Sequence, residues 1–129
     1  MSDTLPTRVR VVIAAPPGLM RNSLQSLLRA MPQVNVIALT ETLETVRAMI
    51  DARTVDCIFL DAEIAEAHDA QWTRVTTQAC VHCLLLAAST QQADALRAQG
   101  MPHVVLKNYL DENLIRDWLN TRALALRAA

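Results

Sequence analysis

The segment 80–83 (CVHC) places two thiols three residues apart with a histidine between them, and Cys57 adds a third thiol. Paired thiols do redox chemistry where a helix start lowers the thiol pKa, and they bind zinc where four ligands meet. This pair instead leads from the end of a predicted helix into a predicted strand, whose alternation points Cys80 and Cys83 to opposite faces. No second pair supplies further zinc ligands. We therefore interpret the thiols as core residues, with a redox or metal site as the alternative.

Phosphate-binding loops are rich in glycine, and this chain has two glycines, Gly18 and Gly100. Neither lies in a GxGxxG or GK[ST] pattern, in which the backbone can approach a phosphate closely. The sequence therefore argues against a nucleotide-binding domain, and we expect no bound cofactor.

The composition indicates one globular domain in 129 residues, because 52% of them are hydrophobic and 19% are charged. The net charge of -1 gives no basic excess for binding nucleic acid. The longest uncharged apolar run, 80–88, is far shorter than the roughly 20 residues of a membrane helix. The polar N-terminus lacks the apolar stretch of a signal peptide, and three cysteines do not make a disulfide framework. We therefore expect a cytoplasmic protein.

Short apolar runs of strand length alternate with amphipathic segments along the chain. In the first amphipathic segment, Leu19, Leu24, Leu27 and Leu28 recur at helical spacing, and Pro32 closes the segment. The predicted strands cover 9–14, 34–39, 56–60, 82–87 and 103–106, and the predicted helices cover 19–31, 42–52, 65–79, 89–99 and 111–127.

Five strand-then-helix units with short connections make a parallel sheet that helices cover on both faces. Right-handed crossovers then favour a doubly wound α/β fold, with the strand order 2-1-3-4-5. In such a fold, ligands bind at the carboxyl ends of the strands, beside the point where the strand order reverses. That position brings together Ala15, Pro16, Asp61, Ala87 and Lys107 around one crevice.

Four pieces of the sequence carry a resemblance to a known family by their order and spacing: RVVIAAPPGLMRNSLQSLL, VDCIFLDAEI, VHCLLLAAS and VVLKN. With them the chain resembles the receiver domain of two-component response regulators, from about residue 8 to residue 124. The subclass that it most resembles usually carries a C-terminal helix-turn-helix. The resemblance implies a single receiver-like domain over residues 1–129, with the flavodoxin-like fold of five strands and five helices.

The resemblance assigns roles to two residues that match the family pattern. Asp61 stands where the family has its phosphoacceptor aspartate, and Lys107 matches the lysine of the fifth strand. Three other positions depart from the pattern, because Ala15-Pro16 replaces a pair of acids and Ala87 replaces a threonine or serine. The pocket is therefore only partly kept.

These departures change the charge of the pocket. An intact pocket holds three acids near one lysine, a net of about minus two that Mg²⁺ balances with its preference for carboxylate oxygens. Here Asp61 is balanced by Lys107 alone, Ala15 offers no ligand and Pro16 lacks a backbone donor. Only an inward-turned Glu63 would rebuild the metal site. We therefore expect no metal, and an ion pair at the strand ends in place of a phosphorylation site.

The relay that couples the pocket to the rest of a receiver is also altered. Ala87 has no hydroxyl group, Val104 replaces an aromatic residue, and 62–65 (AEIA) replaces the usual loop with proline and glycine. We expect such a pocket to hold one conformation without switching.

Two functions follow from these alternatives. The first is a protein-interaction module of signal transduction or transcription regulation, without Mg-dependent aspartyl phosphorylation and without enzymatic activity. Its partner would be a second copy, a signalling enzyme, or a DNA-binding domain in a longer chain. The alternative is a working phosphoreceiver that uses Asp61 in an unusual pocket. Neither function requires the domain itself to bind nucleic acid or a membrane.

The last predicted helix is the candidate interface, because the partner faces of the resembled family include it. Trp118 would lie at the edge of its buried stripe, where large aromatic side chains anchor interfaces, although core packing explains it equally well. Apolar residues beyond the part that covers the sheet indicate a further contact, and we expect a homodimer or a partner there. The interface candidates are Leu114, Trp118, Arg122, Leu124 and Leu126.

Overall fold

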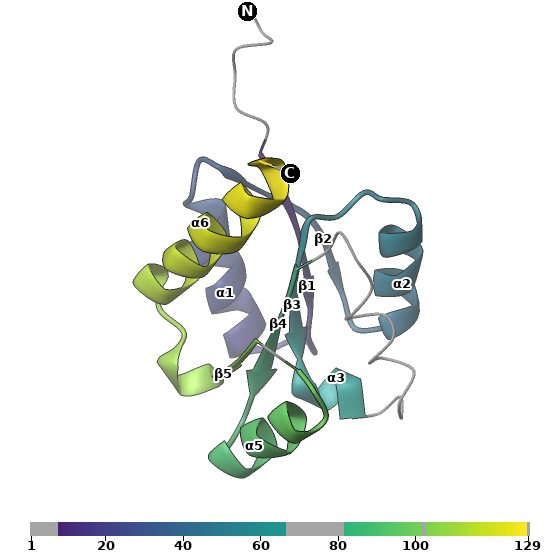
Figure 1. Ribbon diagram of the computed structural model, residues 1–129, viewed down its shortest axis with the longest axis vertical. Coiled ribbons are helices and arrows are strands. Elements are labelled where there is room, and N and C mark those ends of the chain that lie inside the picture. Colours follow the sequence, from purple (N-terminus) through teal and green to yellow (C-terminus); the bar gives the residue numbers. More distant parts are fainter. Residues whose placement is uncertain (1–7, 67–81, 102, 129) are drawn as a thin grey trace, which may run out of the picture.

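The computed structural model describes residues 8–66, 82–101 and 103–128, and for residues 65, 66 and 122–128 it describes the backbone only. Its centre is a parallel sheet of five strands in the order β2-β1-β3-β4-β5 (Figure 1). The strands are β1 (Val9–Ala14), β2 (Val34–Thr40), β3 (Cys57–Asp61), β4 (His82–Ala87) and β5 (Val104–Leu106). The predicted fold class and strand order are therefore confirmed.

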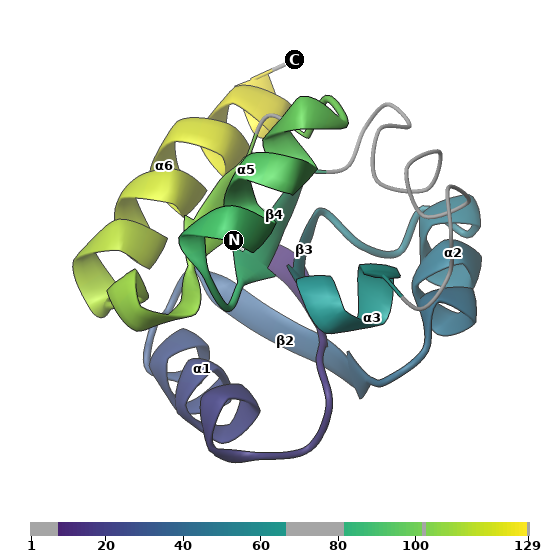
Figure 2. The same cartoon turned by 90° about the horizontal axis from the view of Figure 1, so that it is seen from below.

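Helices cover the sheet on both faces. The helices of the described ranges are α1 (Leu19–Arg29), α2 (Leu43–Asp51), α3 (Ala62–Glu66), α5 (Thr90–Ala98) and α6 (Glu112–Ala128), with a short 3₁₀ helix η2 (Lys107–Tyr109) between β5 and α6. Figures 1 and 2 show α1 and α6 together on one face, and α2, α3 and α5 on the other. Within the described ranges, no helix has both the length and the apolar character needed to cross a membrane.

The strands alternate between two hydrophobic clusters, because successive side chains of a strand point to opposite faces. In β3, Phe59 packs with the residues of α1 and α6, whereas Ile58 and Leu60 pack with those of α2 and α5. All three side chains are fully buried. Burial on both faces explains why the third strand is a continuous apolar run in the sequence.

The segment that follows β3 is helical where the sequence analysis predicts a loop. A helix was expected over 65–79 after a loop at 62–65, but α3 starts at Ala62. The reason is that the Asp61 carboxylate accepts a hydrogen bond from the backbone N–H of Glu63 at 2.9 Å, which satisfies a free donor of the first turn. The rest of the predicted helix, from residue 67, lies outside the described residues.

Candidate functional site at the carboxyl ends of the strands

Asp61 and Lys107 form a direct ion pair at the carboxyl ends of the strands. Lys107 Nζ lies 2.8 Å from Asp61 Oδ2. Asp61 is the last residue of β3 and Lys107 follows β5, so the pair bridges the end of β4, the strand between them. The Asp61 side chain is 2% exposed and that of Lys107 is 23% exposed. The structure thus brings together the two residues that match the family pattern.

The second oxygen of Asp61 is also engaged. Oδ1 accepts the N–H of Glu63, so the carboxylate has one local partner and one partner across the sheet. The residue Glu63 is exposed to solvent. Its side chain therefore lies at the surface, and it is the backbone of Glu63 that contacts Asp61.

The segment after β1 holds the two positions where the resembled family has acids. Ala15 is fully buried and Pro16 is partly buried. The sequence analysis did not single out Arg21, whose Nη1 donates a hydrogen bond to the carbonyl oxygen of Ala15 at 3.3 Å. Because this bond runs from the first turn of α1 to the chain after β1, it helps to hold that segment in place. Only the folded chain, not the residue spacing, reveals the contact.

Ala87 is set apart from the other predicted pocket residues. It ends β4 and is fully buried in the cluster with α2 and α5, whereas Ala15 is buried in the cluster with α1 and α6. Its methyl group therefore adds to a hydrophobic core and offers no polar contact to the ion pair.

The residues of the crevice do not fit Mg²⁺, which needs several oxygen ligands. Asp61 is its one buried carboxylate, and both oxygens of that carboxylate already accept from protein donors. In the described part of the chain, no group of three or more His, Cys, Asp or Glu side chains is arranged to hold a metal ion.

The two described thiols lie inside the protein. Cys57 and Cys83 are both buried and neither forms a disulfide, and they belong to the hydrophobic clusters on different faces of the sheet. Burial, with a smaller contribution from Cys57, raises the pKa of the Cys83 thiol to about 12. A thiol with this pKa stays protonated at neutral pH and is a poor nucleophile. Cys80, the other half of the CxxC pair, lies outside the described residues.

The last helix presents Trp118 to the sheet. The Trp118 ring meets the Phe59 ring edge-on at a centroid distance of 5.6 Å, and it meets the His103 ring at 6.1 Å. The residue packs against the cluster of α1 and α6, in which Ile115 and Leu119 are fully buried. Leu114 is half-buried, and the side chains of the other candidates, Arg122, Leu124 and Leu126, lie outside the described residues. Core packing thus accounts for the position of Trp118.

A groove that the sequence analysis did not predict lies beside the ion pair. It has a volume of about 460 Å³ and is lined by Leu19, Met20, Ser23, Leu24, Leu27, Lys107, Asn108 and Leu110. Leu19, which the helical spacing placed in a buried stripe, is 83% exposed. Leu19 is the first residue of α1, and at about 100° per residue it points roughly 140–180° away from the buried Leu24 and Leu28. The prediction that Leu19 shares the stripe of Leu24 and Leu28 was therefore wrong, because spacings of five and nine residues do not keep side chains on one helix face.

Comparison with solved structures identifies the fold. The response regulatory domain of protein mrkE from Klebsiella pneumoniae matches with a TM-score of 0.72 and 18% identity, over 94% of this chain and 100% of that chain. A chain from the complex of the CheA3 P1 domain with CheY6 of R. sphaeroides matches with a TM-score of 0.72 and 19% identity, over 92% and 98%. The response regulator domain of Thermotoga maritima CheB matches with a TM-score of 0.64 and 17% identity, over 93% and 97%.

The likeness to solved structures is accompanied by low sequence identity, 17–19%. No family model and no curated protein matches this sequence. The structural matches nevertheless cover nearly the whole of both chains, and the strand order is the one predicted from right-handed crossovers. The chain therefore has the fold of a response-regulator receiver domain.

Proposed function

We propose that this chain is a receiver-like module of signal transduction that works by binding other proteins, without Mg-dependent phosphorylation of Asp61. The observation that most supports this proposal is that Ala15 and Pro16 give the crevice no carboxylate after β1, so that Asp61 faces Lys107 alone at 2.8 Å. One ammonium group already balances the one buried carboxylate, so the crevice has no negative charge left to attract a divalent cation.

The position of Asp61 also opposes phosphoryl transfer. Its side chain is 2% exposed and both of its oxygens accept from protein donors, so a phosphodonor would have to displace one of these contacts. A phosphoryl group carries a charge of about −1.5 to −2. Lys107 would have to neutralise that charge without a metal ion, which is the part that Mg²⁺ takes in phosphoryl transfer.

The loss of a relay supports a single working conformation. Ala87 is buried in an apolar cluster, and Val104 is a half-buried aliphatic residue at the start of β5. Neither side chain can form a hydrogen bond to a modified Asp61. We infer that partners recognise the fold as it stands.

A phosphoreceiver with an unusual pocket is the alternative function. One observation favours it, which is that Asp61 and Lys107 meet as the resembled family requires. The alternative needs the ion pair to open and a cation to enter, and it therefore predicts a response to Mg²⁺ and to phosphate mimics.

The comparisons suggest what kind of partner to expect. One of the matched structures holds a CheA3 P1 domain together with CheY6, which is a complex between two signalling proteins. For this chain we propose a protein partner in the cytoplasm: a second copy through the last helix, a signalling enzyme, or a DNA-binding domain such as a helix-turn-helix in a longer regulator of transcription. We propose neither an enzymatic activity nor direct binding to nucleic acid or membranes.

Thermal unfolding with and without Mg²⁺ and beryllofluoride tests the proposal. We expect millimolar Mg²⁺, alone or with beryllofluoride, to leave the Tm of the wild type unchanged, because a ligand that does not bind cannot stabilise the folded state. The matched control is Ala15→Asp/Pro16→Asp, with Pro16→Asp alone as its milder form. These variants restore acids and should gain a saturable rise in Tm with Mg²⁺. A saturable rise in the wild type would overturn the proposal in favour of the phosphoreceiver.

A further inference from the structure

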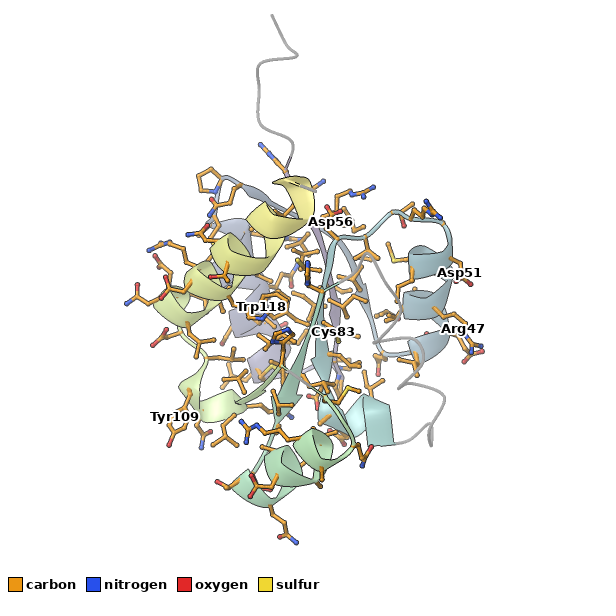
Figure 3. The ribbon with its side chains drawn as sticks, viewed as in Figure 1. Arg47, Asp51, Asp56, Cys83, Tyr109 and Trp118 are labelled. Atoms are coloured by element: carbon orange, nitrogen blue, oxygen red, sulfur yellow. The ribbon has the colours of Figure 1, made fainter. Side chains whose placement is uncertain are left out.

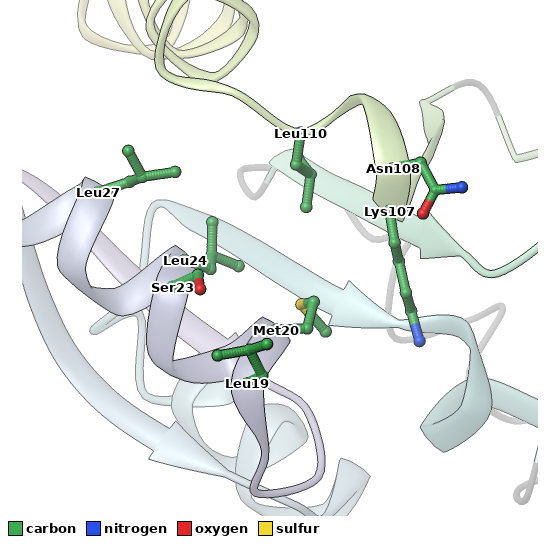
Figure 4. A pocket seen from close by; sticks show the side chains of 8 residues that line it. All are labelled: Leu19, Met20, Ser23, Leu24, Leu27, Lys107, Asn108 and Leu110. Atoms are coloured by element: carbon green, nitrogen blue, oxygen red, sulfur yellow. The ribbon is translucent and has the colours of Figure 1, made fainter.

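The groove beside the ion pair has two walls of different origin. Helix α1 supplies Leu19, Met20, Ser23, Leu24 and Leu27, and the connection from β5 to α6 supplies the rest. Figure 4 shows Met20 and Leu24 pointing from α1 toward this connection, and it shows the side chain of Asn108 pointing away from α1. The amide of Asn108 therefore stays at the rim, and Lys107 is the polar side chain along the second wall.

The groove is electrically neutral and mostly apolar. Among its described lining residues Lys107 is the charged one, and Asp61 lies 2.8 Å from the Lys107 ammonium. Of the remaining residues, Leu19, Met20, Leu24, Leu27 and Leu110 are hydrophobic. The ammonium carries three N–H donors and the contact with Asp61 requires one, so a donor is available to an oxygen acceptor. Such a surface complements an uncharged ligand with one accepting oxygen.

We propose that this groove binds a small, uncharged, mainly apolar molecule whose hydroxyl or carbonyl oxygen accepts a hydrogen bond from Lys107. Its volume of about 460 Å³ falls within the range of small-molecule sites, about 300–1,000 Å³. The groove also lies at the carboxyl ends of the strands, where doubly wound folds bind their ligands. This inference rests on the proposed function in one respect, which is that the ion pair keeps the groove neutral.

A second copy of the chain is a poorer occupant. The charged residues of α1 are Arg21 and Arg29, and the helix contains no acid. Packing α1 of one copy against α1 of another would bring like charges together, which is destabilising. The exposed Leu19 at the mouth would instead lie against the apolar body of a ligand.

A titration with 2-naphthol, which is neutral at pH 7, tests the proposal on the ¹⁵N-labelled protein. We expect saturable shifts confined to the amides of α1 and residues 107–110. Ser23 and Ser26 provide matched variants, because both are exposed on α1 but only Ser23 lines the groove. Ser23→Trp should fill the groove and weaken binding about tenfold or more, whereas Ser26→Trp should leave the Kd within about twofold.

The charged analogue 2-naphthoate tests the chemical class. We expect it to bind more weakly than 2-naphthol, because its carboxylate must lose water in a neutral, apolar groove beside Asp61. Tighter binding of the naphthoate, shifts spread over the surface, or equal binding by both tryptophan variants would each overturn the proposal. Shifts of the same amides by a protein partner but not by 2-naphthol would also overturn it. Because the titration contains no Mg²⁺, its result is independent of the melting experiment, and either proposal can fail alone.

Discussion

Arg10 and Asp56 join β1 to β3 at the end of the sheet opposite the ion pair. Arg10 Nη2 lies 3.0 Å from Asp56 Oδ1, and Arg10 Nε lies 3.1 Å from Asp56 Oδ2. The backbone N–H of Arg10 donates to the same Oδ2 at 2.8 Å. The hydrogen bond with Asp56 raises the pKa of the Arg10 guanidinium above its already high value. Each end of β3 is thus tied to another strand by a charged contact.

Replacement of Asp56 by asparagine should lower stability without changing function. Arg10 would lose a two-point contact with a half-buried carboxylate, so we expect the free energy of unfolding in urea to fall by roughly 1–3 kcal/mol. Asp94→Asn is the matched control, because the Asp94–Arg97 pair is exposed and should contribute less than about 1 kcal/mol. Equal effects of the two variants would contradict the assigned role of Asp56.

The two halves of the functional ion pair should differ in their effect on stability. Lys107→Met leaves a carboxylate that is 2% exposed without its ammonium partner, and we expect a loss of roughly 3–5 kcal/mol in chemical denaturation. Asp61→Asn should cost less, because the long Lys107 side chain is 23% exposed and can reach water. The double variant should recover part of the loss caused by Lys107→Met, which a double-mutant cycle measures.

Asp61→Asn and Asp61→Glu should also leave partner binding nearly unchanged. The physical reason is that neither oxygen of Asp61 is exposed to a partner. Affinity for a partner, measured by calorimetry on folded variants, checks this expectation. Loss of binding in a folded Asn variant would revive the phosphoreceiver.

Trp118 should behave as a core residue whose indole nitrogen is dispensable. Its Nε1 is buried and has no hydrogen-bond partner among the described residues. Trp118→Phe keeps an aromatic ring against Phe59 and removes that unsatisfied donor, so we expect a change of less than about 1.5 kcal/mol. Trp118→Ala should cost about 3–5 kcal/mol by thermal or urea unfolding. A fully stable alanine variant would show that the ring adds nothing to the core.

The proposed contact through the last helix is tested at its C-terminal end. We expect sedimentation velocity to show that Leu124→Glu/Leu126→Glu weakens self-association or the binding of a partner, because it places charges in an apolar contact. Trp118→Phe is the control and should sediment as the wild type does. Folded monomers with unchanged partner binding in all three proteins would place the interface elsewhere.

The buried thiols should resist alkylation until the protein unfolds. In a Cys80→Ser background, iodoacetamide at pH 8 should modify neither Cys57 nor Cys83 of the folded protein, because the pKa of Cys83 is about 12 and both thiols are buried. The fold binds the Cys83 proton more tightly than the unfolded chain does. The contribution of Cys83 to the free energy of unfolding should therefore be fully present below the ordinary thiol pKa of about 9. It should be lost as the pH rises from there toward 12. Rapid modification before unfolding would contradict this.

The strands could be predicted because a strand that is buried on both faces of a sheet is a nearly continuous apolar run in the sequence. Their order could be predicted from the handedness of the crossovers. Apart from Arg10 and His82, the runs 9–14 and 82–87 are apolar, and they match β1 and β4 residue for residue. The helix α3 stands where a loop was predicted at 62–65, because Asp61 caps it and the sequence analysis had considered Asp61 only as a residue of the crevice. One carboxylate serves as both cap and ion-pair partner, and no spacing rule separates these uses.

The sequence predicted which residues pair at the candidate site, but it did not predict how the surrounding residues are arranged. The pairing of Asp61 with Lys107 follows from the strand order. The strands β3 and β5 lie on either side of β4, and their carboxyl ends lie at the same end of the sheet. The outward position of Glu63 depends on the turn of α3, and the contact of Arg21 depends on how α1 sits over β1. The groove arises between two elements far apart in the chain, and only their packing sets its width.

The neutral ion pair has a consequence for how a cell would regulate this module under the proposed function. A receiver that is switched by modification reports the ratio of two chemical states, and its output changes within one lifetime of the modification. A chain whose Asp61 carboxylate stays paired with Lys107 has no modified form whose fraction could carry a signal. Its output then follows mass action, so that its own abundance and the concentrations of partners, competitors and bound ligands set the signal.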